Sequence, residues 1–563
     1  MDEKKLLFYD VEVFQEDAIV VFKDINKEVV KVFHNDFTGI GDLIDGSVLV
    51  GYNNYSYDDH ILSAILSGWS NRQIKKVNDE IIGGARNRFR KTDFRIRSLD
   101  CFQELYQKPG LKKVEGNMGK SIVESGVPFT IERELAISEL EEVIAYCERD
   151  VDATIDVYEA RRWEYFEPKA DLVAMYGTDL AWKFNTTTIA TKLLVDRRVT
   201  KWSELRVPAG VWALAPEDVR AVWDQANGFE GINVKLIEKD LFGCGVTFGF
   251  GGLHGSHRGI KKAKGAVLLD VASFYPSIII NLNILGEATR KYQDIREDRF
   301  RAKREGDASR SESLKLVLNS VFGLMNNEYS DLCNPRGNQT VCIYGQIMLY
   351  ELCRRLAPHA DILNINTDGA IILPKSDRYK EVAKEWAEEF SFQLDERVYD
   401  FFIQKDVNNY LAVEGGDVIV KGADVSRYRD DNFWSNNNAR IVDIAIVEKL
   451  IHGKDIIDTI MEHLGEPKLF QYVLQAGHTY VGTCDQEGEL VGRVNRVFPS
   501  KEGAEAVCLF KLRPDGGRVR FADVPERMRL WNGDCAEIPD FVEWVDIDHY
   551  YKLIMRKLER WVE

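Results

Sequence analysis

The sequence predicts a multidomain protein of the α+β class, with several packed units rather than one doubly wound sheet. Its 563 residues exceed what one core holds, because domains usually contain about 100–200 residues, so about three to five units are expected. Strand-like and helix-like patterns follow one another irregularly, without the strict alternation of a parallel α/β sheet. No internal repeat or low-complexity segment is visible.

The first third of the chain is expected to form strands followed by a long helix. Apolar and polar residues alternate over residues 1–35 on both sides of KDINKE, which predicts a hairpin. Residues 47–66 begin with SVLVGY and read as a strand, a polar loop and a helix. A helix is expected from Ser138 to about Phe166, because Ser138 and Glu141 have the spacing of a capping box. Its apolar stripe consists of Leu140, Val143, Ile144, Cys147 and Val151.

The remaining two thirds mix both types of element. In chain order, the pattern predicts a mostly helical region over 170–240, a strand running into a turn over 266–280, two helices over 290–328 separated by the polar link GDASRSES, a helix over 340–357, and a strand–turn–strand over 361–374. Pro276 is expected to end regular pairing in the second of these segments. The tail from about residue 425 mixes helix and strand and ends in a Trp- and Tyr-rich helix.

The composition is that of a protein of the cytoplasm. Hydrophobic residues make up 45 % and charged residues 29 %, which is ordinary for a globular protein. The sequence contains no stretch of 18 apolar residues, so no membrane span is predicted. The first apolar run is broken by Asp10 and Glu12, so it does not resemble a signal peptide. The nine cysteines are scattered without a C-x-x-C pair, so we expect neither a disulfide framework nor a zinc site.

The net charge of −17 argues, taken alone, against a nucleic-acid partner, because phosphate contacts need Lys and Arg. The basic residues are clustered, however, at 86–97 (RNRFRKTDFRIR), 258–265 (RGIKKAKG) and 296–304 (REDRFRAKR). A solvated face is the alternative interpretation of each cluster. The last two flank a group of candidate site residues, which favours contact with phosphates.

Four acidic residues in the first third form one candidate metal site. Asp10 and Glu12 lie two apart on a predicted strand, so both carboxylates point to one face. A solvated sheet edge is the alternative for this pair. Asp58 lies where GYNNYSYDDHIL enters a helix, and Tyr146 and Asp150 lie four apart on one helix face. Four carboxylates without a thiol suit two Mg²⁺ ions that cleave a phosphodiester.

A second candidate site lies in the middle of the chain. LLDVASFYPSIII ends a strand at Asp270, and NINTDGAII places Asp368 in a tight turn between two apolar strands. Between them, LKLVLNSVFG sets Lys315 and Asn319 four apart, so that one charge and one amide address the same ligand. Gly323 leaves room for the close approach of a backbone or a base pair.

These segments resemble, in the proper order, the six motifs of family B DNA polymerases. Only 45 residues separate Asp270 from Lys315 and Gly323 from Asp368, which is similar to the compact, phage-type members of that family. The first three are similar to Asp-x-Glu, Gly-Tyr-Asn…(Phe/Tyr)-Asp and Tyr-x-x-x-Asp of the DEDD 3′–5′ proofreading exonucleases, and the others to DxxSLYPS, KxxxNSxYG and DTDS. The resemblance implies an RNase H-like exonuclease domain and a right-hand polymerase. The implied division is exonuclease 1–165, connecting helical region 166–240, palm 241–285 and 330–424, fingers 286–329, and thumb with C-terminal region 425–563.

The resemblance also implies the role of each residue. In the exonuclease, Asp10, Glu12, Asp58 and Asp150 would bind metal, Tyr146 would assist the water, and Asn53 would contact the 3′ end. Adjacent Asp59 is the alternative to Asp58, which is preferred because it directly follows Tyr57. In the polymerase, Asp270 and Asp368 would hold two ions. The nucleotide-binding residues would be Ser273, Tyr275, Arg299, Lys303, Lys315, Asn319 and Phe322. Tyr275 would exclude a 2′-OH and Phe322 would pack on the nascent base pair.

The implied cofactor is Mg²⁺, two ions per active site, with Mn²⁺ able to replace it. The implied partners are primer–template DNA, the 3′ end of single-stranded DNA and dNTPs, in the host cytoplasm if a phage encodes the chain. A solvated helix face is the alternative for Arg299 and Lys303.

The sequence departs from the family pattern at several positions. Asn366 replaces the first Asp of the third polymerase motif, and Phe322 replaces the usual Tyr. A Lys-x-Tyr element that grips the primer duplex is present only as Asn408-Asn409-Tyr410, which leaves Tyr410 as the expected DNA contact. The Gly-rich run FGFGGLHG (248–255) is similar to the template-guiding link of small phage polymerases, or is a simple turn with a structural His254. Two alternatives remain, an exonuclease with a decayed polymerase half and a non-catalytic replication scaffold.

Overall fold

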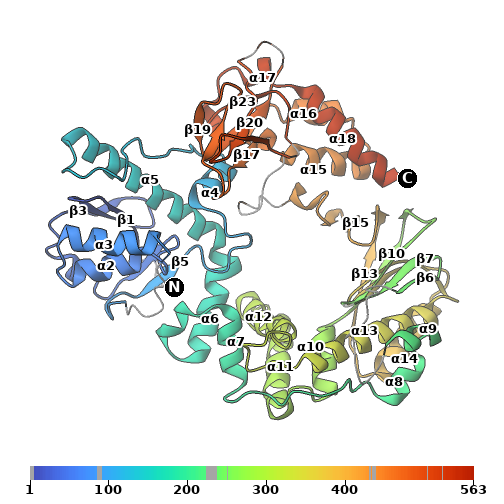
Figure 1. Cartoon of the computed structure of the whole chain (residues 1–563). Coiled ribbons are helices and arrows are strands. Elements are labelled where there is room, and N and C mark those ends of the chain that lie inside the picture. The colour runs from blue at the N-terminus through green and yellow to red at the C-terminus, as the bar shows by residue number, and fades with distance from the viewer. Residues whose placement is uncertain are drawn as a thin grey trace. The chain divides into compact units, whose positions relative to one another are not determined.

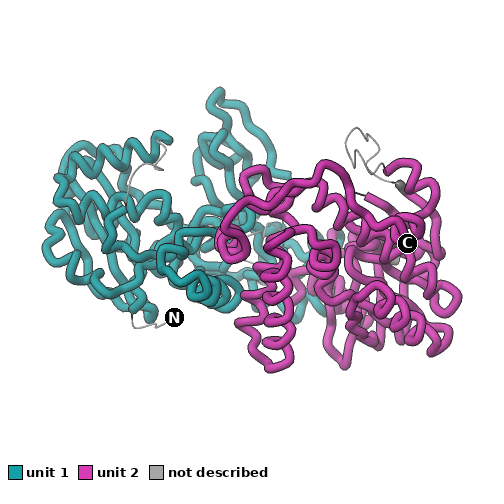
Figure 2. Tube along the Cα trace, turned by 90° about the horizontal axis from the view of Figure 1, so that it is seen from below, with its two compact units in different colours: residues 1–185, 431–442, 457–552 teal, residues 186–430, 443–456, 553–563 magenta. Residues whose placement is uncertain are grey.

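The computed structural model describes residues 5–84, 92–223, 237–249, 251–429, 433, 439–501, 503, 505–522 and 524–562. The chain forms two compact units, shown in Figure 2. Unit 1 contains residues 1–185, 431–442 and 457–552, and unit 2 contains residues 186–430, 443–456 and 553–563. Most of the first basic cluster, at 86–91, and residues 224–236 of the expected helical region lie outside the described residues. Within the described ranges, no helix is both long and apolar enough to cross a bilayer.

The N-terminal part of unit 1 is built on a five-stranded sheet with the order β3-β2-β1-β4-β5 (Figure 1). Its strands are β1 (Leu6–Val13), β2 (Ala18–Lys23), β3 (Val29–His34), β4 (Val48–Gly51) and β5 (Ser98–Asp100). The expected hairpin is therefore extended to a three-stranded meander, because β1 pairs with β2 in addition to the β2–β3 pair around the predicted turn. Strands β4 and β5 continue the sheet in parallel.

Helices cover both faces of this sheet. They are α1 (Ile40–Ile44), α2 (Asp58–Leu66), α3 (Asn71–Ile82), α4 (Leu111–Met118), α5 (Ile137–Arg161) and α6 (Glu167–Tyr176). Phe8 and Val21 of the sheet pack in one cluster with Val143 and Val151 of α5. Alternate strand residues pack in a second cluster with α2 and α3. Because side chains alternate along a strand, Asp10 and Glu12 share the face of Phe8, which is the face covered by α5.

The expected capping box of α5 is wrong by two residues. The helix begins at Ile137, and the Glu139 carboxylate accepts a hydrogen bond from the Ala136 backbone N–H at 2.8 Å. Arg133 donates to the same carboxylate, which fixes Glu139 in this position. Ser138 and Glu141 therefore lie inside the first turns rather than at the cap. The helix continues as a π-helical turn over Arg162–Phe166, and α6 follows from Glu167 without a break, so the helical run extends beyond the expected end near Phe166.

Unit 2 is built on a seven-stranded sheet with the order β13-β10-β12-β11-β8-β7-β6. Its strands are β6 (Ile237–Leu241), β7 (Cys244–Phe248), β8 (Leu253–His257), β10 (Ala266–Val271), β11 (Ala360–Asn366), β12 (Gly369–Pro374) and β13 (Leu394–Tyr399). A four-stranded sheet consists of β9 (Lys262–Ala263), β14 (Phe401–Gln404), β15 (Tyr410–Glu414) and β16 (Asp417–Lys421). The helices are α7 (Thr186–Leu194), α8 (Ala209–Leu214), α9 (Glu217–Val222), α10 (Phe274–Asn281), α11 (Thr289–Glu305), α12 (Ala308–Leu324), α13 (Pro335–Leu356) and α14 (Arg378–Glu389).

Two local expectations for unit 2 are corrected. Residues 274–281 form helix α10 rather than a strand end and a turn, because Ser273 takes a left-handed conformation (φ 50°) and Pro276 lies in the first turn, where its missing N–H costs no hydrogen bond. The link between α11 and α12 is short, because the Asp307 side chain accepts from the Arg310 N–H and caps α12. Most of GDASRSES is therefore helical.

The C-terminal part of unit 1 contains two small sheets, of order β17-β20-β23 and β19-β18-β21-β22. The strands are β17 (Tyr472–Gln475), β18 (Gly482–Cys484), β19 (Leu490–Gly492), β20 (Val494–Pro499), β21 (Phe510–Leu512), β22 (Arg518–Arg520) and β23 (Met528–Leu530). The remaining helices of the chain are α15 (Arg440–Val447), most of which belongs to unit 2, α16 (Ile456–Glu462), α17 (Phe541–Trp544), and α18 (Ile547–Val562), which is divided between the two units.

Arg496 of β20 joins this part to α4. Its fully buried guanidinium donates to the Gln471 side chain at 2.7 Å, to the Gly116 carbonyl at 3.0 Å, and to the carbonyls of Lys120 and Gly533. Burial lowers the pKa of Arg496, but an arginine stays charged in a protein, so these acceptors compensate a buried charge. The end of α4 thus depends on a side chain about 380 residues away.

Replacing Arg496 by Met is expected to lower the free energy of unfolding of unit 1 by about 3–5 kcal/mol. The change leaves buried carbonyls without their donor, and Met cannot replace it. Urea unfolding followed by tryptophan fluorescence measures the loss. Arg520→Met is the matched control, because the Arg520 side chain is 73 % exposed, and it should change stability by less than about 0.5 kcal/mol. Equal effects of the two changes would contradict the assignment.

Candidate active sites

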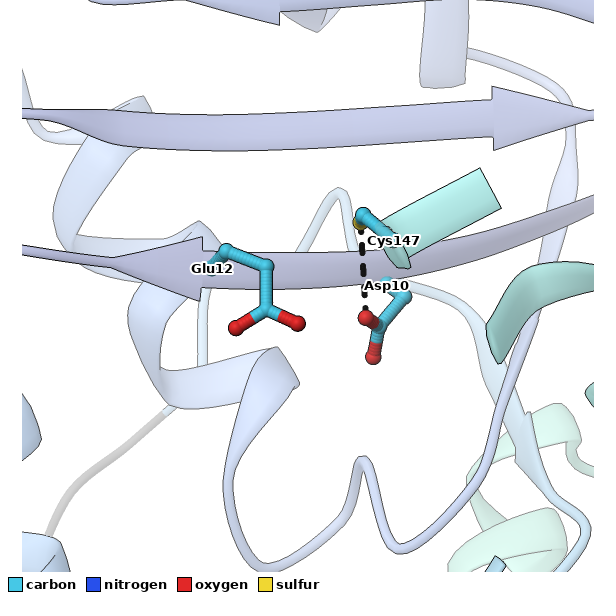
Figure 3. Close-up of side chains that lie close together, drawn as sticks. All are labelled: Asp10, Glu12 and Cys147. Carbon is cyan, nitrogen blue, oxygen red and sulfur yellow. Dashed lines mark hydrogen bonds between the residues drawn. The ribbon is translucent and has the colours of Figure 1, made fainter. Parts of the chain in front are cut away.

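The first candidate site lies between β1 and α5 in unit 1. One ligating atom from each of Asp10, Glu12 and Cys147 falls within 4.8 Å of the others. Figure 3 shows Asp10 and Glu12 on the strand, with Cys147 reaching Asp10 from a helix. The Cys147 thiol donates to Asp10 Oδ2 at 3.4 Å, which corrects the expectation of a site without a thiol. Asp150 lies one turn further along α5, so the helix presents its acidic face to the strand pair.

The carboxylates of this site repel one another in a buried environment. Burial raises the pKa of Asp10 to about 7, and the charge of Asp150 adds to the rise. Burial also raises the pKa values of Glu12 and Asp58, and in both cases Asp10 is the strongest charged contributor. Four carboxylates at this depth are stable when protons or cations compensate their charge. The predicted set Asp10, Glu12, Asp58 and Asp150 is therefore brought into one electrostatic group.

Asp58 and Asp59 differ sharply in their surroundings. Asp59 is fully buried and its two carboxylate oxygens accept hydrogen bonds from side chains around it. The donors are Tyr9 and Ser98, each at 2.7 Å, Asn54 at 3.1 Å and Lys183 at 3.2 Å. In contrast, Asp58 Oδ1 is buried and has no hydrogen-bond partner among the described residues. An unpartnered carboxylate oxygen beside Asp10 fits a cation ligand, whereas Asp59 is a structural residue.

Lys112 of α4 is a site residue that the sequence patterns missed. Its Nζ forms an ion pair with Asp150 and a second with Glu115 at 3.2 Å, and it lies 4.6 Å from the centre of the Tyr146 ring. Burial raises the pKa of Tyr146, so its hydroxyl stays protonated. A lysine 38 residues from its partner leaves no signal in local spacing. Lys112 holds Asp150 and Tyr146 in one arrangement.

Asn53 lies in the loop between β4 and α2, in a left-handed conformation (φ 64°). The Asn53 N–H donates to Asp100 Oδ1 at 2.7 Å, and the Phe102 N–H donates to the same atom at 2.8 Å. Asp100, at the end of β5, was also missed. Burial raises the pKa of Asp100 to about 6. Asp100 fixes the loop backbone, while the Asn53 side chain remains half-buried.

The raised pKa of Asp10 predicts a pH dependence of stability in the absence of divalent cations. The folded pKa of about 7 lies above the ordinary value of 3.8, so the folded chain binds the proton more tightly than the unfolded chain. The stabilising contribution is therefore complete below about pH 4 and is lost as the pH rises through about 7. Thermal unfolding in EDTA should show this loss, and Asp10→Asn should reduce it. An equal pH dependence of the variant and the unmodified chain would contradict the prediction.

The second candidate site lies at one end of the seven-stranded sheet in unit 2. Asp270 of β10 is opposite Gly369 in the β10–β12 register, and the Val271 N–H donates to the Asp368 carbonyl at 2.8 Å. Asp270 is thus at the end of β10, beside the turn between β11 and β12 that carries Asp368. Burial, followed by the charge of Asp368, raises the pKa of Asp270 to about 6. Asp395, opposite Asp270 on β13, is a third carboxylate that the sequence patterns missed.

Asn366 has a structural part in the turn that presents Asp368. Its Oδ1 accepts from the Thr367 N–H at 2.9 Å, as Asn and Asp side chains often do in turns. His254 Nε2 lies 3.1 Å from Thr367 Oγ1, within hydrogen-bond distance. A Cβ at Gly252 would lie 2.6 Å from the Thr367 Cα, so only glycine allows the Gly-rich run to approach this turn. Phe250 of that run lies outside the described residues.

Several predicted nucleotide-binding residues approach the two carboxylates. Arg299 of α11 donates to Ser273 Oγ at 2.8 Å, and Lys303, one turn later, pairs with Asp395 at 3.2 Å. The rings of Tyr275 and Phe322 lie 4.6 Å apart. The Tyr275 hydroxyl is buried without a hydrogen-bond partner among the described residues.

The structure places Lys315, Asn319 and Tyr410 differently from the predicted residues that approach the two carboxylates. Lys315 pairs with Glu312 of its own helix at 2.9 Å, and Asn319 is exposed. No hydrogen bond or ion pair within the described ranges joins either residue to the carboxylates. Tyr410 is only 7 % exposed and packs on Phe402, with ring centres 5.5 Å apart. Its ring therefore offers little surface to a ligand.

Comparisons with known proteins find a likeness among solved structures. No model of a protein family matches the chain, and no curated protein matches it. Among solved structures, the fold is similar to the family B DNA polymerase from the hyperthermophilic archaeon Pyrobaculum calidifontis, at a TM-score of 0.46 and 12 % sequence identity. The match covers 99 % of this chain and 78 % of the other.

Proposed function

We propose that this chain is a template-directed DNA polymerase of the family B type with 3′–5′ exonuclease proofreading. The observation that supports this most is the presence of two groups of carboxylates, each within its own unit. One is the buried or half-buried set Asp10, Glu12, Asp58 and Asp150, and the other is half-buried Asp270 with exposed Asp368. The order of the six sequence motifs supports the same function.

In this proposal the chain is divided as the motifs suggest. Residues 1–165 are the exonuclease domain, 166–240 connect it, 241–285 with 330–424 form the palm, 286–329 the fingers, and 425–563 the thumb and C-terminal region. Residues 457–552 of the last region cluster with the exonuclease residues, through contacts such as those of Arg496.

Both clusters fit Mg²⁺, two ions at each site. The donors are carboxylate oxygens, which Mg²⁺ prefers, and Asp58 Oδ1 is buried without a partner among the described residues. Burial raises the pKa of the Cys147 thiol, so it stays protonated on Asp10 and leaves the ligand positions to the carboxylates. Asp10, Glu12, Asp58 and Asp150 would hold the ions of the exonuclease, and Asp270 and Asp368 those of the polymerase. When bound, Mg²⁺ lowers the pKa of an attacking hydroxyl or water and neutralises charge on the leaving oxygen. Mn²⁺ has similar ligand preferences and would replace it.

The chain's own residues position the reacting groups of the exonuclease. The Tyr146 hydroxyl, kept protonated by burial, orients the attacking water beside Asp150. Lys112 holds Asp150 in place through their ion pair. Asn53, on a loop fixed by Asp100, contacts the 3′ end of the single strand. These groups align water and phosphodiester, which removes much of the entropic cost of the reaction.

In the polymerase, α11 and the rings beside Asp270 select and hold the nucleotide. Arg299 and Lys303 bind its phosphates, and Ser273 orients Arg299. Tyr275 lies under the sugar and excludes a 2′-OH, and Phe322 packs on the base pair. Lys315 and Asn319 join the phosphate contacts when α12 and its neighbour close on the nucleotide, which releases Lys315 from Glu312.

A gel assay with a 5′-labelled primer on a longer template tests this proposal. With Mg²⁺ we expect extension when dNTPs are present and shortening when they are absent. Shortening in both lanes would replace the proposal with an exonuclease whose polymerase half has decayed. An unchanged primer in both lanes would favour a non-catalytic scaffold.

A further inference from the structure

Asp270 lies at the end of one face of the seven-stranded sheet. Ala266, Leu268 and Asp270 are alternate residues of β10, so their side chains lie on the same face. Ala266 and Leu268 pack in a cluster with Phe402 and Tyr410 of the four-stranded sheet. The four-stranded sheet therefore covers this face, and Asp270 lies at the end of the contact between the two sheets.

Lys421 lies at the same end of the contact between the two sheets. It is opposite Tyr410 in the β15–β16 register, and residues directly opposite on antiparallel strands share a face. Ile419, two residues earlier on β16, packs in the same cluster as Tyr410 and Leu268. Lys421 thus points from the covering sheet toward the carboxylate end. Burial raises the pKa of Asp368, and the charge of Lys421 opposes that rise, which is consistent with this placement.

The Lys421 ammonium is available to an anion. The residue is exposed, and no ion pair joins it to any residue in the part of the chain that the structure describes. By contrast, Lys405 of the same sheet pairs with Asp424. An exposed cation beside two acids, in a chain with a net charge of −17, suits a polyanion that must approach those acids.

We propose that Lys421 binds a backbone phosphate of the primer strand close to its 3′ end. This inference rests on the proposed polymerase function. The primer 3′-OH must lie at Asp270 and Asp368, so the adjoining phosphodiester lies beside them. Arg299 and Lys303 approach through Ser273 and Asp395, on the β13 side of β10. Gln404, opposite Tyr410 on β14, accepts a hydrogen bond from Asn364 of β11, so Lys421 reaches the acids from the β11–β12 side, which separates a primer contact from the nucleotide contacts.

In this proposal, Lys421 makes the DNA contact that the sequence pattern predicted for Tyr410. Tyr410 is 7 % exposed, and its ring fills the space between the two sheets. Its part is to support Lys421 from the opposite strand. The interaction is with phosphate, so it reads no base and acts equally on every primer sequence.

Binding of a fluorescein-labelled primer–template duplex at several salt concentrations tests this inference. Lys421→Gln should weaken the Kd about tenfold at low salt, since it removes one charged hydrogen bond. The slope of log Kd against log salt should fall by about 0.9, which corresponds to one phosphate contact. Lys421→Arg should restore both values. The KM for dNTPs at saturating duplex and the shortening of single-stranded DNA should not change.

The matched control is Lys384→Gln. Lys384 is an exposed lysine of α14, and that helix contacts Glu396 through Tyr379 on the opposite face of the sheet. It should leave the salt slope unchanged. If the unmodified chain extends primers and Lys421→Gln keeps the full slope, or raises only the KM for dNTPs, the inference is overturned while the proposed function stands. If the unmodified chain neither binds the duplex nor extends it, both the inference about Lys421 and the proposed polymerase function are contradicted.

Discussion

Replacing Asp270 or Asp368 by Asn is expected to slow primer extension at least about a thousandfold, because each carboxylate supports several kcal/mol of charge stabilisation in phosphoryl transfer. Asp270 lies on β10 beside the turn that carries Asp368, and the charge of Asp368 adds to the raised pKa of Asp270. Asn keeps the size of the side chain but not its charge. Single-nucleotide incorporation in rapid-quench experiments measures the rate, and shortening of single-stranded DNA should continue unchanged.

Asp361→Asn is the control for this pair of variants. Asp361 lies on β11 of the same sheet and pairs at the surface with Lys375 at 2.6 Å. It should extend primers at the rate of the unmodified chain. Extension retained by Asp270→Asn or by Asp368→Asn would show that the second site is not the polymerase centre.

Asp58→Asn and Asp59→Asn are expected to have opposite effects, although the residues are adjacent. Asp58→Asn should reduce exonuclease activity at least about a thousandfold, because it removes a carboxylate from the candidate metal site. It should keep or raise stability in EDTA, since it removes one buried and repelled charge. Asp59→Asn should lower stability by roughly 2–4 kcal/mol, because an amide cannot accept from all the donors around Asp59.

Two measurements on each variant separate these roles. Digestion of a 5′-labelled single strand gives the exonuclease rate, and urea unfolding gives the stability. Primer extension by Asp58→Asn is the control for correct folding of the other unit. A fully active Asp58→Asn, or an Asp59→Asn that is stable and inactive, would exchange the assignments of the two residues.

Local spacing in the sequence predicted part of each carboxylate group, and the motif resemblance suggested which distant acids belong together. Asp10 and Glu12 share a face through strand alternation alone, and Asp368 lies in a turn that its flanking strands define. The helix α5 and the strand–turn–strand of β11 and β12 were likewise expected from periodicity. The errors were also local. A nearer carboxylate, Glu139, caps α5, and Asp307 shortens the link that GDASRSES suggested.

Contacts between distant segments could not be predicted from the pattern. Lys112 reaches Asp150 across the fold, and Arg496 reaches Gly116. Lys421 is placed by the pairing of β15 with β16, which no spacing of acids or bases reveals. Each of these residues is a single cation with nothing distinctive around it in the sequence. Their roles become visible only from their burial, their strand register and the charged groups near them in the structure.

A 5′-labelled primer with a mispaired 3′ end tests most directly whether both activities reside in this chain. With Mg²⁺ and all four dNTPs, the unmodified chain should first shorten the primer and then extend it to full length. Asp58→Asn should leave the mispaired primer largely unextended while extending a paired one. If the unmodified chain extends a paired primer but leaves the mispaired primer unshortened, the proposed proofreading exonuclease is contradicted.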